Sequence, residues 1–296
     1  MSFSVKLWGT RGSIPTPGPS TQKYGGNTAC VEIRTDSTLF ICDGGTGLRE
    51  LGIDLMRRHP DGAIVGHMLF SHPHWDHIQG FPFFEPAYRS ENLFFIYGTF
   101  QGERHIFELL SGQMRLEYFP VDFSELLARL VPAELSPAGT EIDGVTVRAF
   151  RQNHPGGSLA FSLVKDGVKI VYATDVELDD LLLDREASLR DPDKPREFPP
   201  EWLEFVRGAD LLVADGQYTD QEYLNRIGWG HPRATTVVDL AAAAGVSRLL
   251  LTHHDPMQDD DSVDRKIAAC QERAARLAPG LWVEGAREGM ELFVGR

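Results

Sequence analysis

Short apolar runs of strand length recur in two batches along this chain, and no other feature of the sequence constrains the fold as much. Each run contains β-branched or aromatic residues and is bounded by glycine or other turn formers, a pattern typical of buried β-strands. The first batch covers residues 5–8, 29–34, 38–43 and 63–70. The second batch covers residues 144–150, 158–164, 168–174, 210–215, 248–254, 281–285 and 290–294.

Segments with the periodicity of amphipathic helices separate these runs. In residues 47–59, the side chains of Leu48, Leu51, Ile53 and Leu55 are spaced for one buried face. Further helices are expected at residues 102–114, 234–245 and 262–278. Strands in two batches with helices between them predict an α/β fold, a layered sandwich that forms one domain over residues 1–296.

The segment 184–200 departs from this pattern, because it carries four prolines and many charges of both signs. Such a composition is typical of a surface loop or flap and not of a core element. Two alternatives stay open at this point: a solvated insertion, or a lid over a substrate site.

The composition excludes several classes of protein. The formal net charge of −14 repels nucleic acid and anionic membranes unless a local cationic site overrides it, so extended nucleic acid is not an expected partner. Cys30, Cys42 and Cys270 lack CxxC spacing, which indicates neither a disulfide framework nor a thiolate zinc site. The sequence shows no export leader and no apolar stretch of about 18 residues. We therefore expect a cytoplasmic protein that does not span a membrane.

Residues 71–80, SHPHWDHIQG, gather three histidines and an aspartate within six positions. The cluster follows the apolar run 63–70, so it stands at the carboxyl end of an expected strand, where open α/β sheets tend to place ligands. Neutral imidazoles and a carboxylate are donors that Zn²⁺ and related divalent metals prefer, and crowding them together without a cation is costly. The motif therefore predicts a metal site.

These residues resemble the HxHxDH signature of the metallo-β-lactamase-fold hydrolases, and the other motifs of that family follow in order. Asp43 in ICDGGTG resembles the aspartate that braces the metal-binding loops. The resemblance implies a four-layer αββα sandwich and two divalent ions, Zn²⁺ or else Mn²⁺ or Fe²⁺, with a bridging water. The ligands that it implies are His72, His74 and His154 for one metal, Asp76, His77 and His253 for the other, and Asp175 for both.

The last ligand is ambiguous, because His253 and His254 are adjacent. We favour His253, which directly follows the threonine at the expected strand end, as in the family pattern. His154 and Asp175 have plainer interpretations as a loop histidine and a turn former, but the complete order of motifs outweighs them. Three other histidines match no motif and are expected to be surface or packing residues: His59, His67 and His105.

Two further motifs resemble the phosphodiesterase branch of this fold, which includes cyclic-nucleotide phosphodiesterases and tRNA 3′-processing ribonucleases. Asp215 ends the run 210–215, and His231 lies in GWGH shortly before an expected helix. The resemblance implies that Asp215 orients His231 near the scissile phosphate, where the histidine stabilises charge or protonates the leaving oxygen. The plainer alternative is a turn and helix cap. Asp76 is expected to serve catalysis as well as metal binding.

The expected activity is metal-dependent hydrolysis of a phosphodiester by the metal-bridging hydroxide. Only 21 positions separate His154 from Asp175, which leaves no room for the tRNA-gripping arm of the ribonucleases. A 3′,5′-cyclic nucleotide or a similar small phosphodiester is therefore the favoured substrate. The alternatives are a tRNA 3′-processing endoribonuclease and a non-catalytic metal-binding accessory protein. The sequence is compatible with a homodimer but does not establish one.

Several side chains are candidates for contacts with such a substrate. Arg11 and Lys23, in the glycine-rich first loop, are candidates for binding phosphate. Candidates for stacking on a base are Phe83, Phe84, Tyr218, Tyr223 and Trp229. Most aromatic side chains belong to protein cores, so packing is the plainer interpretation of each. Trp75 is expected to pack or to line the rim of the site.

Overall fold

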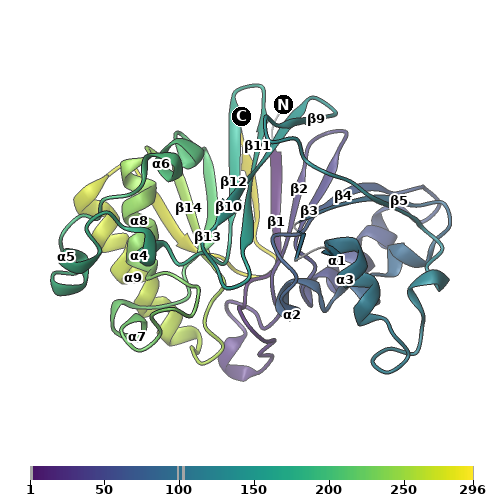
Figure 1. Cartoon of the computed structure of the whole chain (residues 1–296), viewed down its shortest axis with the longest axis horizontal. Helices are drawn as coiled ribbons and strands as arrows, with labels where there is room; N and C mark the ends of the chain where they lie inside the picture. The colour runs from purple at the N-terminus through teal and green to yellow at the C-terminus, as the bar shows by residue number, and fades with distance from the viewer. Residues whose placement is uncertain (1–2, 99, 102–103, 296) are drawn as a thin grey trace. The chain divides into compact units, whose positions relative to one another are not determined.

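The computed structural model describes residues 3–98, 100–101 and 104–295 and divides the chain into two compact units (Figure 1). Unit 1 comprises Met1–Gly18, Gly25–Ser136 and Arg287–Arg296, and unit 2 comprises Pro19–Tyr24 and Pro137–Ala286. Each unit contains one seven-stranded sheet. The single domain expected from the sequence stays a prediction.

The sheet of unit 1 positions the histidine motif. Its strands are β1 (Phe3–Gly9), β2 (Cys30–Arg34), β3 (Leu39–Cys42), β4 (Val65–Leu69), β5 (Leu93–Tyr97), β8 (Arg129–Pro132) and β16 (Glu291–Val294). The order is β16-β1-β2-β3-β4-β5-β8, antiparallel from β16 to β3 and parallel from β3 to β8. Because β3 and β4 are parallel neighbours, the residues that follow them meet at one edge of the sheet. The sequence did not predict β5 and β8.

The helices of unit 1 are α1 (Gly47–Arg58), α2 (Trp75–Ile78) and α3 (Ile106–Gln113), with 3₁₀ turns at Phe81–Phe83, Glu85–Tyr88 and Phe123–Glu125. Leu48, Leu51 and Leu55 of α1 are buried in the core, as predicted, whereas Ile53 is only half-buried. The expected helix 102–114 begins later, at Ile106, because β6 (Phe100–Gln101) first pairs with β7 (Arg104–His105). Residues 102–103 of that prediction lie outside the described residues.

The sheet of unit 2 is antiparallel on one side and parallel on the other. Its strands are β9 (Thr140–Ile142), β10 (Val145–Gln152), β11 (Ser158–Lys165), β12 (Val168–Ala173), β13 (Leu211–Asp215), β14 (Arg248–Thr252) and β15 (Trp282–Gly285). The order is β15-β14-β13-β12-β11-β10-β9, with β12 to β15 parallel. The carboxyl ends of β12, β13 and β14 therefore share one edge. All but β9 were predicted.

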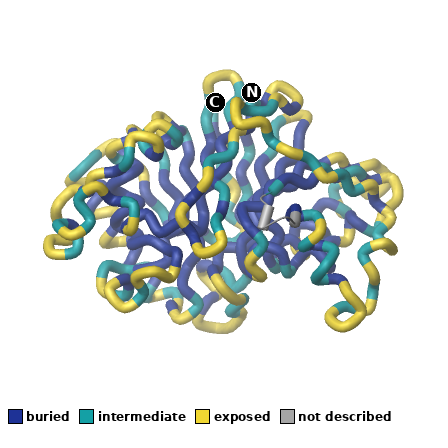
Figure 2. The backbone as a smooth tube through the Cα atoms, in the orientation of Figure 1, coloured by how far each residue is buried: buried dark blue, intermediate teal, exposed yellow. Residues whose placement is uncertain are grey.

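The helices of unit 2 are α4 (Leu178–Leu181), α5 (Arg185–Arg190), α6 (Pro200–Val206), α7 (Asp220–Tyr223), α8 (Ala234–Ala243) and α9 (Asp260–Leu277), with a 3₁₀ turn at Pro19–Thr21. The predicted helices 234–245 and 262–278 correspond to α8 and α9. Their apolar side chains join those of the sheet in one core cluster. Figure 2 shows that the central strands are mostly buried, whereas the connecting loops are mostly exposed.

The segment 184–200 is exposed over most of its length, as expected of a surface segment, but it also has regular structure and contacts with the core. It contains the short helix α5, and Phe198 belongs to the hydrophobic core of unit 2. Ser188 and Arg196 are also buried. Among its charged residues, Arg196 has partners in an ion network of unit 2.

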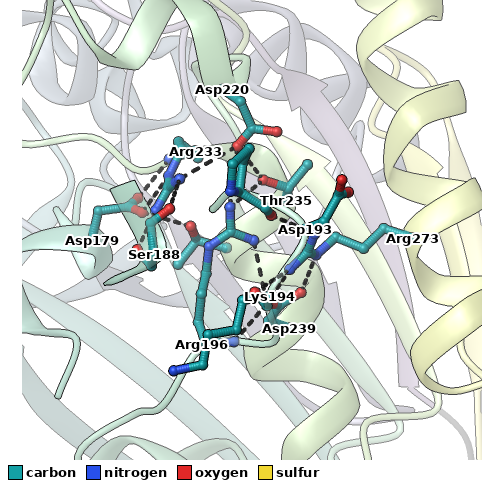
Figure 3. A network of polar contacts seen from close by, with 12 residues as sticks. Asp179, Ser188, Asp193, Lys194, Arg196, Asp220, Arg233, Thr235, Asp239 and Arg273 are labelled. Carbon is teal, nitrogen blue, oxygen red and sulfur yellow. Dashed lines mark hydrogen bonds and ion pairs between the residues drawn. The ribbon is translucent and has the colours of Figure 1, made fainter. Parts of the chain in front are cut away.

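Three buried arginines and three aspartates form this arginine–aspartate network: Arg196, Arg233, Arg273, Asp179, Asp220 and Asp239 (Figure 3). Arg196 Nη1 lies 3.3 Å from Asp239 Oδ2, and the backbone N–H of Arg196 donates to the same oxygen at 3.0 Å. Arg273, on α9, donates to both carboxylate oxygens of Asp239 and to the carbonyls of Pro192 and Lys194. The network therefore ties the segment 184–200 to α8 and α9.

No helix within the described ranges is long and apolar enough to cross a membrane. The three cysteines, Cys30, Cys42 and Cys270, are buried and free. Burial raises the pKa of the Cys30 and Cys42 thiols and raises that of Cys270 to about 12. They are therefore unreactive core thiols.

Candidate metal centre

The HxHxDH motif lies in unit 1, in the connection that follows β4. His74 stands immediately before α2, so Asp76 and His77 fall in the first turn of that short helix. The ring centroids of His74 and His77 each lie 4.3 Å from that of His72. The structure thus brings the four side chains of the motif together.

Asp43 braces this motif from the end of β3. Its Oδ1 accepts a hydrogen bond from the backbone N–H of Ser71 at 2.7 Å, and its Oδ2 accepts from the Ser71 hydroxyl at 2.8 Å. His77 Nδ1 donates to Oδ2 at 2.8 Å, so His77 Nε2 carries the lone pair and lies 3.3 Å from Asp76 Oδ2. Asp43 has a left-handed backbone (φ 60°), a conformation that is uncommon for residues other than glycine. It fixes the ring orientation and tautomer of His77.

Three further predicted ligands lie in unit 2. His154 Nε2 is 3.6 Å from Asp175 Oδ2, and His253 Nε2 is 3.2 Å from Asp175 Oδ1. The two oxygens of Asp175 therefore face two different imidazoles, as a carboxylate shared between two cations requires. Nδ1 of His154 donates to the Gly230 carbonyl at 2.9 Å, and Nδ1 of His253 donates to Gln217 Oε1 at 2.8 Å. Both Nε2 atoms therefore carry lone pairs.

His254 points away from this group. Its Nε2 donates to the carbonyl of Ala286 at 3.0 Å, and its ring packs edge-on against Tyr24 at a centroid distance of 5.1 Å. His253 instead adopts a left-handed backbone (φ 58°) directly after β14, which turns its ring toward Asp175. This geometry favours His253 over His254 as a ligand.

Asp215 and His231, the predicted catalytic pair, are hydrogen-bonded in unit 2. His231 Nδ1 donates to Asp215 Oδ2 at 2.7 Å. Asp215 also accepts from the backbone N–H groups of Gln217, at 2.9 Å, and Asp175, at 3.2 Å. The ring of His231 stacks on that of His253 with centroids 4.9 Å apart. Asp215 therefore holds His231 beside two candidate ligands and fixes its protonated nitrogen.

Glu177 is a residue of this site that the sequence analysis missed. Its carboxylate is buried and accepts from the backbone N–H groups of Gly228, at 2.7 Å, and Gly230, at 2.9 Å. Two residues further on, Asp179 accepts from the backbone N–H of Arg233 at 2.8 Å. Asp175, Glu177 and Asp179 thus alternate along one segment. The acidic alternation in TDVELDD was the available signal.

Ser13, Ser71 and Gln217 were also missed. The backbone N–H of Ser13 donates to Asp76 Oδ2 at 2.7 Å within unit 1. Ser71 links Asp43 to the histidine motif, and Gln217 holds His253. Ser71 and Gln217 each lie just beyond a strand end, but serine and glutamine at such positions carry no motif.

A buried lysine, Lys266 of α9, contacts the backbone of Gln217. Its Nζ donates to the Gln217 carbonyl at 3.0 Å and to Gln258 Oε1 at 2.8 Å. Burial disfavours the ammonium form and lowers the pKa of Lys266 to about 8. Between pH 8 and about 10.4, the unfolded chain therefore binds more protons than the folded one.

This difference predicts a pH-dependent effect of Lys266→Met. The contribution of Lys266 to the free energy of unfolding should rise as the pH increases from 8 to about 10.4, by about 3 kcal/mol in total. Below pH 8 the desolvation penalty is constant. Urea unfolding of both proteins at several pH values measures the difference between them. Parallel stability curves for the wild type and the variant over this range would contradict the prediction.

The residues predicted to contact substrate differ in their burial and in the partners of their side chains. Arg11 is buried and donates to the Gly25 carbonyl at 2.8 Å, and Lys23 Nζ lies 2.6 Å from Asp264. Both cations therefore have structural partners. The stacking candidates Phe84, Tyr218 and Tyr223 are buried, whereas Phe83 and Trp229 are exposed. Trp75 is exposed as well.

The donor set in each unit fits divalent cations of the zinc class. Imidazole nitrogens and carboxylate oxygens supply the contacts, and the Nδ1 atoms of His77, His154 and His253 are held by oxygen acceptors. Such outer partners orient metal-binding imidazoles. The same ligand types accept Zn²⁺, Mn²⁺ or Fe²⁺.

Comparison with known proteins identifies similar sequences and folds. A family model described as the β-lactamase superfamily domain matches residues 38–254. Ribonuclease Z of Methanosarcina acetivorans is 27% identical over 294 residues, covering 87% of this chain and 89% of the relative. The metallo-β-lactamase-fold protein YhfI of Bacillus subtilis has a TM-score of 0.65, 16% identity, and coverage of 99% of this chain and 100% of its own. Human tRNase Z, short form, has a TM-score of 0.64, 18% identity, and coverage of 99% and 100%. The two sheets and their helices match the metallo-β-lactamase sandwich fold.

Proposed function

Because the chain belongs to the β-lactamase superfamily domain family, we propose that it is a metal-dependent phosphodiesterase that cleaves RNA, with the 3′ end of precursor tRNA as its substrate. The hydrogen bond between His231 and Asp215, beside Asp175, is the observation on which the proposal chiefly rests. A histidine placed in this way next to a metal-binding carboxylate suits the cleavage of a phosphodiester.

Proteins of the metallo-β-lactamase fold depend on two metal ions, and the motifs of this chain supply histidine and aspartate donors for them. We assign His72, His74 and His154 to one cation, Asp76, His77 and His253 to the other, and Asp175 to both. Two such cations lower the pKa of bound water and offset negative charge on the phosphate. Zn²⁺ is the cation that we propose, because it favours imidazole and carboxylate ligands.

The protein's own side chains supply the remaining chemistry. Asp215 keeps the proton of His231 on Nδ1 in the neutral ring, and it stabilises the imidazolium when Nε2 also carries a proton. In that form, His231 donates a hydrogen bond to the phosphoryl oxygen or a proton to the leaving oxygen. Glu177 holds the backbone on which His231 is carried.

The relatives favour RNA over the cyclic nucleotide expected from the sequence alone. The relative from Methanosarcina acetivorans is named a ribonuclease and aligns over most of both chains. The net charge of −14 concerns the whole molecule, whereas two cations at the site would attract a phosphate locally.

A small phosphodiester is the second candidate, and one observation favours it. Between His154 and Asp175 the chain forms only the hairpin of β11 and β12, which is closed by a tight turn at Asp166 and Gly167. No RNA-gripping arm is inserted there. A 3′,5′-cyclic nucleotide needs no such arm.

An activity panel tests both candidates. The full chain, loaded with Zn²⁺ or Mn²⁺, is incubated with precursor tRNA that carries a 3′ trailer, with cyclic AMP and with bis(p-nitrophenyl) phosphate. We expect precursor tRNA and the chromogenic diester to be cleaved, and a chelator to abolish both activities. Turnover of cyclic AMP without tRNA cleavage would establish the second candidate. Metal-loaded protein that cleaves no phosphodiester would exclude both.

A further inference from the structure

An exposed tryptophan and an arginine lie on the loop that carries His231. Trp229 is 60% exposed, although it is only two residues from the buried His231. The Arg226 guanidinium carbon lies 4.9 Å from the ring centroid of Trp229 and 5.7 Å from that of Tyr218. Tyr218 packs edge-on against His231, with centroids 5.9 Å apart. A chain of ring and guanidinium contacts therefore leads from His231 through Tyr218 and Arg226 to Trp229.

The loop is held firmly although its tip is exposed. Glu177 accepts hydrogen bonds from Gly228 and Gly230, the two neighbours of Trp229. Gly230 has φ of 88°, and a Cβ atom there would lie 2.4 Å from His154 Nδ1, so only glycine fits. Because the backbone on both sides of Trp229 is held in this way, a ligand that binds the indole would lose little backbone entropy.

The guanidinium group of Arg226 has N–H donors that could bind a ligand. Among the described residues, its side chain makes ring contacts with Trp229 and Tyr218 but no hydrogen bond or ion pair. A guanidinium carries five N–H donors in a planar fork that matches phosphate oxygens. Stacking against two rings holds that fork in place without using its donors.

We propose that Trp229 and Arg226 form a nucleotide subsite, in which a base next to the scissile phosphate stacks on Trp229 and a neighbouring phosphate binds Arg226. The inference rests on the proposed phosphodiesterase function and specifies its substrate as one that carries a nucleoside. Two residues of chain span at most about 7 Å, so Trp229 stands within reach of a base adjacent to His231. Stacking of this kind tolerates any base.

Two chromogenic diesters with the same leaving group test the subsite: thymidine 5′-(p-nitrophenyl phosphate) and methyl p-nitrophenyl phosphate. In Trp229→Ala we expect kcat/KM for the thymidine ester to fall by about tenfold, mainly through KM, and that for the methyl ester to change less than twofold. Arg226→Lys keeps the charge but loses the planar fork that would bind a neighbouring phosphate. It should therefore impair cleavage of the 3′-phosphorylated thymidine ester, which carries a second phosphate, more than cleavage of the thymidine ester itself.

The chain offers a matched control in the pair Arg248 and Trp282, whose guanidinium carbon and ring centroid lie 4.8 Å apart. These residues begin β14 and β15, at the sheet edge opposite His253, so Trp282→Ala should affect neither ester. Equal losses on both esters in Trp229→Ala, or no loss on either, would overturn the subsite. If the wild type cleaves neither ester, the proposed function fails. The subsite is then tested separately, by calorimetric measurement of AMP binding to the wild type and to Trp229→Ala. Binding lost in Trp229→Ala supports the subsite, and binding that is absent or unchanged overturns it.

Discussion

Replacing His231 by alanine is expected to lower kcat on an RNA phosphodiester by about 10³-fold while the protein keeps its full metal content. The expectation follows from the position of His231, whose Nδ1 is bonded to Asp215 and which is not among the proposed ligands. Steady-state kinetics with precursor tRNA measures the loss, and elemental analysis of the dialysed variant measures the metal. A variant with unchanged turnover would remove His231 from the mechanism.

The choice of leaving group separates the two roles proposed for His231. If the histidine protonates the leaving oxygen, His231→Ala should harm RNA cleavage far more than cleavage of bis(p-nitrophenyl) phosphate, because p-nitrophenolate leaves without a proton. If it stabilises charge on the phosphoryl group, both substrates should lose similar amounts. Asp215→Asn is the companion variant. It keeps the size of the side chain but removes the charge that stabilises an imidazolium.

Replacing Asp239 by alanine is expected to lower the free energy of unfolding by about 3–5 kcal/mol. Asp239 is the shared acceptor of Arg196 and Arg273, and all three side chains are buried. Its removal leaves two guanidinium groups in the interior without their main counterion. Because single domains are stable by about 5–15 kcal/mol, the loss is a large fraction of the total. Urea denaturation measures it.

An exposed ion pair provides the control for this prediction. Glu186 and Arg190 of α5 lie 2.7 Å apart with side chains that are mostly in solvent. Glu186→Ala should leave the unfolding midpoint nearly unchanged, because solvent screens such pairs. A small effect of Asp239→Ala, similar to that of Glu186→Ala, would show that the arginine–aspartate network contributes little to stability.

The sequence predicted the elements whose patterns are local. The runs that became β10, β11 and β12 show strand-length apolar patterns between turn formers, and α1 places its leucines on one face. β5 is an apolar run as well, but nothing in its sequence shows that it pairs with β4 and β8. The edge strands β8 and β9 are short and partly exposed, so their burial patterns are weak.

In the site as well, residues within recognisable local motifs were predicted, whereas a residue whose role depends on distant partners was not. Asp215 and His231 are 16 positions apart, yet their motifs sufficed to predict the pair that the structure shows hydrogen-bonded. Glu177 could not be assigned a role, because its partners, the N–H groups of Gly228 and Gly230, become visible only when the loop is folded. The burial of Arg196 within the segment 184–200 could not be predicted for a related reason, because a charged residue in a sequence shows no sign of whether it faces solvent or buried aspartates.

Because Asp175, Glu177 and Asp179 alternate along the chain, this segment should not tolerate an insertion or a deletion. Each carboxylate meets a different partner: the imidazoles of His154 and His253, the loop of His231, and the start of α8. Adding or deleting one residue there would displace all three at once. By contrast, the exposed positions of the loop that carries Trp229 can vary singly. Divergence of substrate preference among related chains should therefore accumulate in that loop, while the acidic segment keeps its length.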